Sequence, residues 1–161
     1  MTPTERAQLI EQYMDGYRVI TDALAGADDA ALDAREAPGE WSPREVVHHL
    51  ADSEMTSAIR IRRVLVEDNP EIQGYDEAAF AARLWYDRPI DNSLEAFRLA
   101  RVTTGELLTR MSDADWQRGG THSDSGRYTS EDWLRIYAIH AHEHADQIRR
   151  ARDGGTSGLG T

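Results

Sequence analysis

The chain has 161 residues and no cysteine, and its 29 acidic and 18 basic side chains give a formal net charge of −11. This length suits one domain with its own apolar core, and the lack of cysteine excludes disulfides, thiolate ligands and a cysteine nucleophile. Because so acidic a protein repels phosphates, and because no apolar run could span a bilayer or form a signal peptide, we expect a cytoplasmic protein that binds neither nucleic acid nor membrane.

The first helix is predicted to run from about Pro3 to Leu24. Thr2 would be its N-cap, Pro3 would occupy the first helical position, and Glu5 would close a capping box. Apolar side chains recur along this segment with the helical period, which indicates that one face turns to a core. The side chains on this face are Leu9, Ile10, Tyr13, Tyr17, Ile20 and Leu24.

The second helix has the clearest start signal in the chain. Ser42 is followed by Pro43 and then by Glu45 at the third helical position, which is again a capping box. Apolar residues continue at helical spacing as far as Leu65, and the proline at position 70 ends the pattern. We therefore expect a long amphipathic helix here.

A long connection, residues 70–91, separates the second helix from the third. Its length favours a crossover over a tight hairpin, as in some four-helix bundles, and residues 76–84 are expected to form a short helix within it. The third helix is expected to begin at Asn92 or Ser93 and to carry apolar residues as far as Met111.

The last helix is expected to follow a glycine-rich loop at residues 119–126, with Thr129 and Asp132 as a third capping box. Strand signals are weak throughout, and residues 153–161 are expected to form a flexible tail. The sequence therefore predicts an all-α protein in which residues 1–152 form one four-helix bundle domain with a long crossover between helices two and three. The apolar stripe of the last helix comprises Trp133, Ile136, Tyr137, His140, His144 and Ile148.

Two histidines on this stripe, His140 and His144, indicate a metal site. Their i, i+4 spacing places the imidazoles side by side, and neutral imidazole is the commonest transition-metal ligand. Buried imidazoles need partners for their ring nitrogens, and a metal meets part of that need. The alternative is a pair of core histidines bonded to protein groups. His142 lies on the opposite face and is expected to be solvated.

A catalytic metal site usually takes three protein ligands, and the second helix offers His48 and His49 as the third. These two side chains point about 100° apart, so at most one of them faces the same place. Periodicity does not decide between them. His49 shares a side with small residues, whereas His48 lies in a more polar row, which favours His49 weakly. His122, in the glycine-rich loop, is expected at the surface.

Two motifs together resemble those of the DinB-like superfamily. One is the segment Glu40–Glu54, which contains Trp-Ser-Pro-Arg-Glu-Val-Val-His-His-Leu-Ala-Asp, and the other is the His-x-x-x-His near the C-terminus. The resemblance is to the YfiT-type branch of metal-dependent hydrolases and bacillithiol transferases. It implies a four-helix bundle, a divalent metal (zinc or nickel) held by three histidines, and a homodimer in several members. The family's first ligand, the histidine directly before the leucine, corresponds to His49, and the other two correspond to His140 and His144.

The resemblance implies a metal-dependent enzyme that activates a low-molecular-weight thiol, as an S-transferase, or water, as a hydrolase, and acts on a small molecule. A non-catalytic metal-binding or small-molecule-binding protein associated with stress is the alternative. No catalytic residue is assigned. Asp52 would orient an imidazole or be solvated, Glu143 is expected at the surface, and Gln147 stands where some relatives have a histidine. Arg60, with its neighbours Arg62 and Arg63, would attract an anionic substrate or pair with acids.

Overall fold

The computed structural model describes residues 1–156, and this part of the chain is built around four long helices. The predicted bundle and its crossover are thereby confirmed, with α1 ending at Leu24 as expected. Helix α7 extends beyond the expected domain boundary to Thr156, and the rest of the predicted tail, residues 157–161, lies outside the described residues. The four helices are α1 (Pro3–Leu24), α3 (Pro43–Val66), α5 (Asp91–Leu108) and α7 (Ser130–Thr156).

The capping boxes form as predicted and set where three of these helices begin. The hydroxyl of Thr2 accepts from the backbone N–H of Glu5 in α1, and the carboxylate of Glu5 accepts from the N–H of Thr2. The same reciprocal pair joins Ser42 to Glu45 in α3. Helix α5 begins at Asp91, slightly earlier than the predicted start at Asn92 or Ser93. Its N-cap residue, Ile90, makes no side-chain hydrogen bond to the helix.

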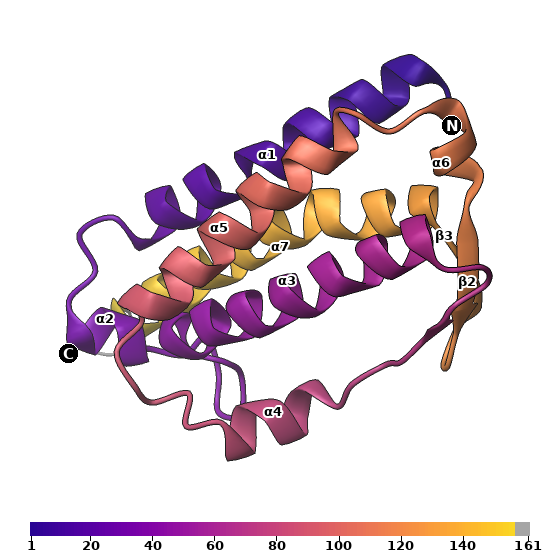
Figure 1. The fold of residues 1–161 in the computed structure, drawn as a ribbon. Helices are drawn as coiled ribbons and strands as arrows, with labels where there is room; N and C mark the ends of the chain where they lie inside the picture. Colours follow the sequence, from indigo (N-terminus) through magenta and orange to yellow (C-terminus); the bar gives the residue numbers. More distant parts are fainter. Residues whose placement is uncertain (157–161) are drawn as a thin grey trace.

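The crossover gives the bundle its topology. Helices α3 and α5 run in the same direction, as do α1 and α7, and the chain between α3 and α5 passes outside the bundle through α4 (Figure 1). Helix α7 packs against both α1 and α3, while α5 packs against the same two helices. The short helices are α2 (Asp29–Asp33), α4 (Glu77–Arg83) and α6 (Asp113–Gln117).

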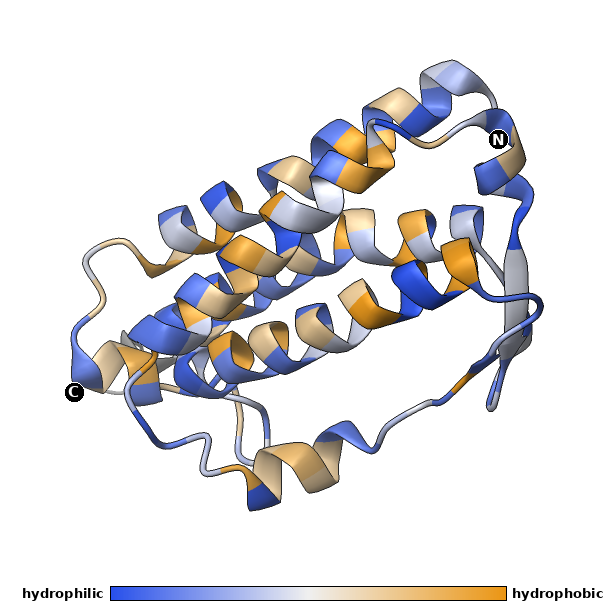
Figure 2. Ribbon diagram, in the orientation of Figure 1, coloured by the Kyte–Doolittle hydropathy of each residue, from blue (hydrophilic) through white to orange (hydrophobic). Residues whose placement is uncertain are grey.

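The helices are amphipathic, with apolar and polar stretches alternating along each ribbon (Figure 2). In α7 the buried face differs from the predicted stripe, because Ile136 is 47% exposed whereas Leu134 and several alanines are fully buried. Helix α7 contacts two helices, and its buried face turns toward both. The histidines His140 and His144 consequently lie at the edge of this face and are half-buried.

A small three-stranded sheet, which the sequence analysis did not predict, closes one end of the described bundle. A Cβ atom on Gly120 would lie 2.2 Å from the Pro70 carbonyl oxygen, so the close approach of β1 and β2 requires glycine there. The strands are short and polar, which explains their weak signal. They are β1 (Glu71–Ile72), which pairs in parallel with β2 (Gly119–His122), and β3 (Gly126–Thr129), which pairs antiparallel with β2.

The segment expected to be a glycine-rich loop is therefore a β-hairpin, and His122 belongs to its first strand. Gly126 has a φ of 76°, which glycine adopts without strain at the end of the turn. Within residues 1–156, no helix is both long and apolar enough to serve as a transmembrane span.

Candidate metal centre

Three imidazoles from two helices meet at the α3–α7 contact. The Nε2 atom of His140 lies 3.3 Å from Nε2 of His49 and 3.2 Å from Nε2 of His144. One nitrogen from each ring falls within 4.8 Å of the other two, and within the described residues these three form a group that could hold a metal ion. The structure thus brings together the three histidines that the resemblance selected.

Local packing orients each ring. The indole of Trp41, just before α3, packs against His49 with ring centroids 4.8 Å apart. The Nδ1–H of His144 donates to the side-chain oxygen of Gln147 at 2.7 Å, one turn further along α7, which leaves Nε2 with a free lone pair. The phenol ring of Tyr137 packs edge-on against His140, with centroids 5.9 Å apart.

Burial keeps all three imidazoles neutral at physiological pH. Removal from water, reinforced by the nearby His144, lowers the pKa of His49 from 6.5 to about 3. Burial and the two neighbouring histidines lower the pKa of His140 to about 2, and burial also lowers the pKa of His144. A neutral ring nitrogen with a free lone pair is the form that binds a metal.

The donor set fits a divalent transition metal. Imidazole nitrogen suits zinc and nickel, and three convergent nitrogens from rigid helices leave room for a substrate or water as a further ligand. Nδ1 of His49 is buried and has no hydrogen-bond partner among the described residues. No protein hydrogen bond therefore fixes the Nδ1 side of this ring, and its Nε2 side is the one that meets the other imidazoles.

The remaining histidines lie outside this group. His48 is fully buried, and polar groups satisfy both of its ring nitrogens: it donates to the carbonyl of Arg88 and accepts from the hydroxyl of Ser93. His142 is half-buried rather than solvated, because its Nε2–H donates to the carbonyl of Gln12 in α1. His122 is half-buried on β2 and lines the same pocket as His140, but it does not belong to the group of three.

The two carboxylates considered in the sequence do not support an imidazole. Asp52, for which orienting an imidazole and being solvated were both open, is half-buried and accepts a hydrogen bond of 2.7 Å from the hydroxyl of Tyr86; among the described residues no hydrogen bond joins it to an imidazole. Glu143 is exposed, as predicted. Gln147 supplies the contact instead, at an i, i+3 spacing from His144 that sequence inspection would detect.

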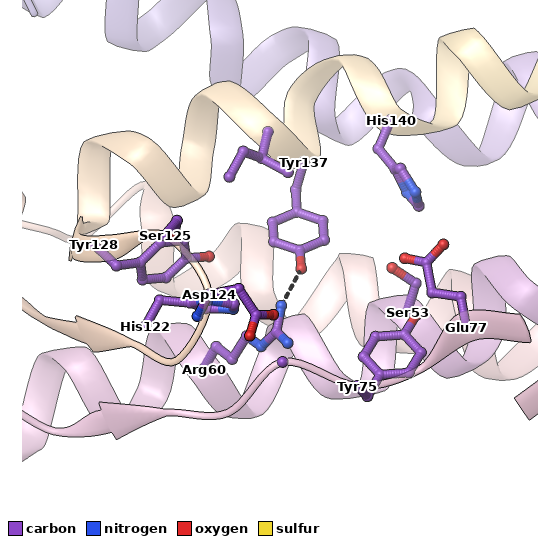
Figure 3. A pocket seen from close by; sticks show the side chains of 12 residues that line it. Ser53, Arg60, Tyr75, Glu77, His122, Asp124, Ser125, Tyr128, Tyr137 and His140 are labelled. Atoms are coloured by element: carbon purple, nitrogen blue, oxygen red, sulfur yellow. Dashed lines mark hydrogen bonds between the residues drawn. The ribbon is translucent and has the colours of Figure 1, made fainter. Parts of the chain in front are cut away.

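One of the three histidines, His140, also lines a pocket of about 280 Å³. Figure 3 shows His140 and Tyr137 on α7 facing Arg60 and Ser53 on α3. The guanidinium of Arg60 donates to the Tyr137 hydroxyl at 3.0 Å and to the carbonyl of Gln73 at 2.7 Å. Arg60 thus faces the pocket, whereas its neighbour Arg63 pairs with Glu67.

Sequence reasoning missed the aromatic lining of this pocket. Tyr75 comes from the connection before α4, Tyr128 from β3 and Tyr137 from α7. The first two lie in segments without a helical pattern, so no periodicity indicated where they would point. Two acidic residues, Glu77 and Asp124, line the same pocket.

Comparison with known proteins agrees with the observed fold. The model of the DinB superfamily matches residues 12–148. A relative from Oceanobacillus iheyensis is 32% identical over 139 residues, which cover 86% of this chain and 81% of the relative. YfiT from Bacillus subtilis is 37% identical over 132 residues, which cover 80% of this chain and 74% of YfiT. Both relatives are named as candidate metal-dependent hydrolases.

Solved structures show the same architecture. The YfiT structure is described as having an unusual four-helix bundle topology. It superposes with a TM-score of 0.87 at 28% identity, and the match covers 100% of this chain and 91% of YfiT. The four-helix bundle protein TT2238 shares the fold. Its structure superposes with a TM-score of 0.64 at 21% identity, and the match covers 89% of this chain and 98% of TT2238. From the family match and these relatives, the chain belongs to the DinB superfamily.

Proposed function

We propose that the protein is a divalent-metal-dependent enzyme that acts on a small molecule bound beside His49, His140 and His144. The observation that carries this proposal is the position of His140, which belongs to the histidine group and also lines the pocket. A substrate in this pocket would reach the metal directly. A purely structural metal site would instead be closed by a fourth protein ligand.

In catalysis, the residues of this chain would hold the metal and limit the access of bulk water to it. The three imidazoles would bind zinc or nickel, and when bound, either metal would supply the positive charge that lowers the pKa of water or a thiol. Trp41 covers one side of His49, which limits access of bulk water from that direction. Gln147 fixes the tautomer of His144.

The nucleophile would be water, for a hydrolase, or a low-molecular-weight thiol, for an S-transferase. The names of the relatives from Oceanobacillus iheyensis and Bacillus subtilis support hydrolysis. Because the chain has no cysteine, a thiol would have to arrive as a cosubstrate. A homodimer, which the resemblance implies, would be tested by measuring the mass of the protein in solution.

The test is to compare metal content and turnover in the purified protein and two variants. His49→Ala should abolish metal binding and turnover of both a model ester and a thiol–monochlorobimane pair. His142→Ala is the matched control, because it removes a histidine from α7 that does not belong to the group, and it should retain both properties. Bound metal without turnover of either substrate would favour a binding protein, and unchanged metal content in His49→Ala would contradict the site.

A further inference from the structure

The pocket beside the histidines contains buried polar atoms that the protein itself does not satisfy. The hydroxyl of Tyr128 and the Nε atom of Arg60 are both buried without a hydrogen-bond partner among the described residues. The hydroxyl of Tyr75 is buried as well, and Ser53 lies near enough to it to lower its pKa. All three side chains line this pocket. Unpartnered buried polar groups are uncommon in folded proteins and call for an explanation.

Tyr128 makes the strongest case, because its side chain is only 4% exposed. A buried hydroxyl without a partner costs stability, so a phenylalanine would be the better choice for packing alone. Burial raises the pKa of Tyr128, and the hydroxyl therefore stays protonated and able to donate. The side chain of Tyr128 lines the pocket beside His140 (Figure 3).

Arg60 determines the charge of the ligand that would fit. Its Nη atoms are occupied by Tyr137 and Gln73, and its free Nε–H can only donate. The guanidinium also lies over the ring of Tyr75, 5.9 Å from the ring centroid. A permanent positive charge beside two phenol hydroxyls favours a ligand with negatively charged acceptor oxygens.

The acidic side chains of the pocket limit that negative charge. Glu77 and Asp124 line the same space, so they repel a dianion such as phosphate about twice as strongly as a monoanion at the same position. We propose that the pocket binds the carboxylate of a monoanionic substrate through Arg60, Tyr75 and Tyr128. This inference rests on the function proposed above.

The geometry connects this carboxylate subsite to the histidines. Tyr137 lies between them, since its hydroxyl accepts from Arg60 and its ring packs against His140. A substrate anchored by its carboxylate at Arg60 would extend past one tyrosine side chain to reach His140. The subsite would therefore select substrates whose carboxylate is a few bonds from the reacting atom.

The first test measures binding of butyrate and of its neutral isostere butyramide to the full-length protein by ¹H–¹⁵N NMR. Butyrate should bind saturably and at least tenfold more tightly than butyramide. Arg60→Gln should weaken butyrate at least tenfold, whereas Arg62→Gln should not, because Arg62 donates to Ala58 and Thr104 and does not line this pocket. Equal binding of butyrate and butyramide would overturn the proposal, as would tighter binding of methylphosphonate.

A second test uses variants that separate binding from folding. Tyr128→Phe should weaken butyrate at least threefold while the melting temperature stays the same or rises, because no protein hydrogen bond is lost. Tyr86→Phe is the matched control: it breaks the bond to Asp52, so the melting temperature should fall and butyrate affinity should not change. Unchanged butyrate affinity in Tyr128→Phe would contradict the subsite.

His49→Ala distinguishes the carboxylate subsite from the proposed metal site. Butyrate should still bind this variant, because the anchoring groups lie on Arg60 and the tyrosines and His49 does not line the pocket. Loss of butyrate binding in His49→Ala would show that the carboxylate binds the metal itself and would overturn the subsite. An inactive protein that retains selective butyrate binding would contradict only the proposed enzyme function.

Discussion

A hydrogen bond of 2.7 Å to Gln147, one turn further along the same helix, orients the ring of His144. Gln147→Ala removes the acceptor of the Nδ1–H, so the ring would rotate more freely and change tautomer. Loss of such a partner typically costs 10–100-fold in metal affinity, and we expect about tenfold here. Competition with a chromogenic chelator would measure it. Glu143→Ala, at an exposed position of the same helix, should bind metal like the parent protein.

The depressed pKa values of the histidines predict how stability depends on pH. In the unfolded chain these rings titrate near 6.5, whereas in the folded protein the pKa of His49 is about 3 and that of His140 about 2. Between these values the unfolded state binds more protons, so the metal-free protein loses stability as pH falls below 6.5 and keeps it above. Each such histidine contributes at most about 1.4 kcal/mol per pH unit.

Urea unfolding of the metal-free protein at pH 7.5 and pH 5.5 would measure this dependence. The free energy of unfolding should be lower at pH 5.5, and His140→Leu should show a smaller difference between the two pH values because one titrating ring is gone. A parent protein that is equally stable at both values would show that the rings bind as many protons in the folded state as in the unfolded state, which contradicts lowered pKa values.

At the scale of the elements, helix α7 carries two of the three histidines and starts directly after the β-hairpin. Its first turn is capped by Thr129, whose hydroxyl accepts from the N–H of Asp132 at 3.1 Å. Thr129→Ala removes this cap and should lower the free energy of unfolding by about 1 kcal/mol. Chemical denaturation would measure the loss. Thr103→Ala, at an exposed interior position of α5, should be neutral within about 0.5 kcal/mol.

At the scale of the whole molecule, a buried ion pair links all four long helices. Glu54 of α3 accepts from Nε of Arg101 of α5 at 2.8 Å and from the hydroxyl of Tyr13 of α1 at 2.5 Å. Arg101 also donates to the carbonyl of Tyr137 in α7. Gly16 provides the space for the guanidinium, since a Cβ atom there would lie 1.9 Å from it. The network thereby fixes how the helices that carry the histidines are placed.

Breaking this pair on one side should destabilise the fold strongly. Arg101→Met leaves the carboxylate of Glu54 buried without its cation, a change that typically costs about 3–5 kcal/mol. The double variant Glu54→Leu with Arg101→Met removes both charges and should recover much of that loss. Thermal and urea unfolding would measure both variants. A double variant no more stable than Arg101→Met would mean that packing and backbone contacts, and not the unpaired charge, account for the loss.

The sequence alone determined the local features of this protein. Helix starts depend on residues within one turn, as at Thr2 and Ser42, and the spacing of His140 and His144 is a property of a single helix. The tertiary structure decided the rest, because the relevant contacts join distant segments. Periodicity could not choose between His48 and His49, and only the packing of α3 against α7 brings His49 to the other two rings while His48 turns toward α5. The hairpin and the tyrosine-lined pocket likewise depend on pairings between segments with no regular pattern of their own.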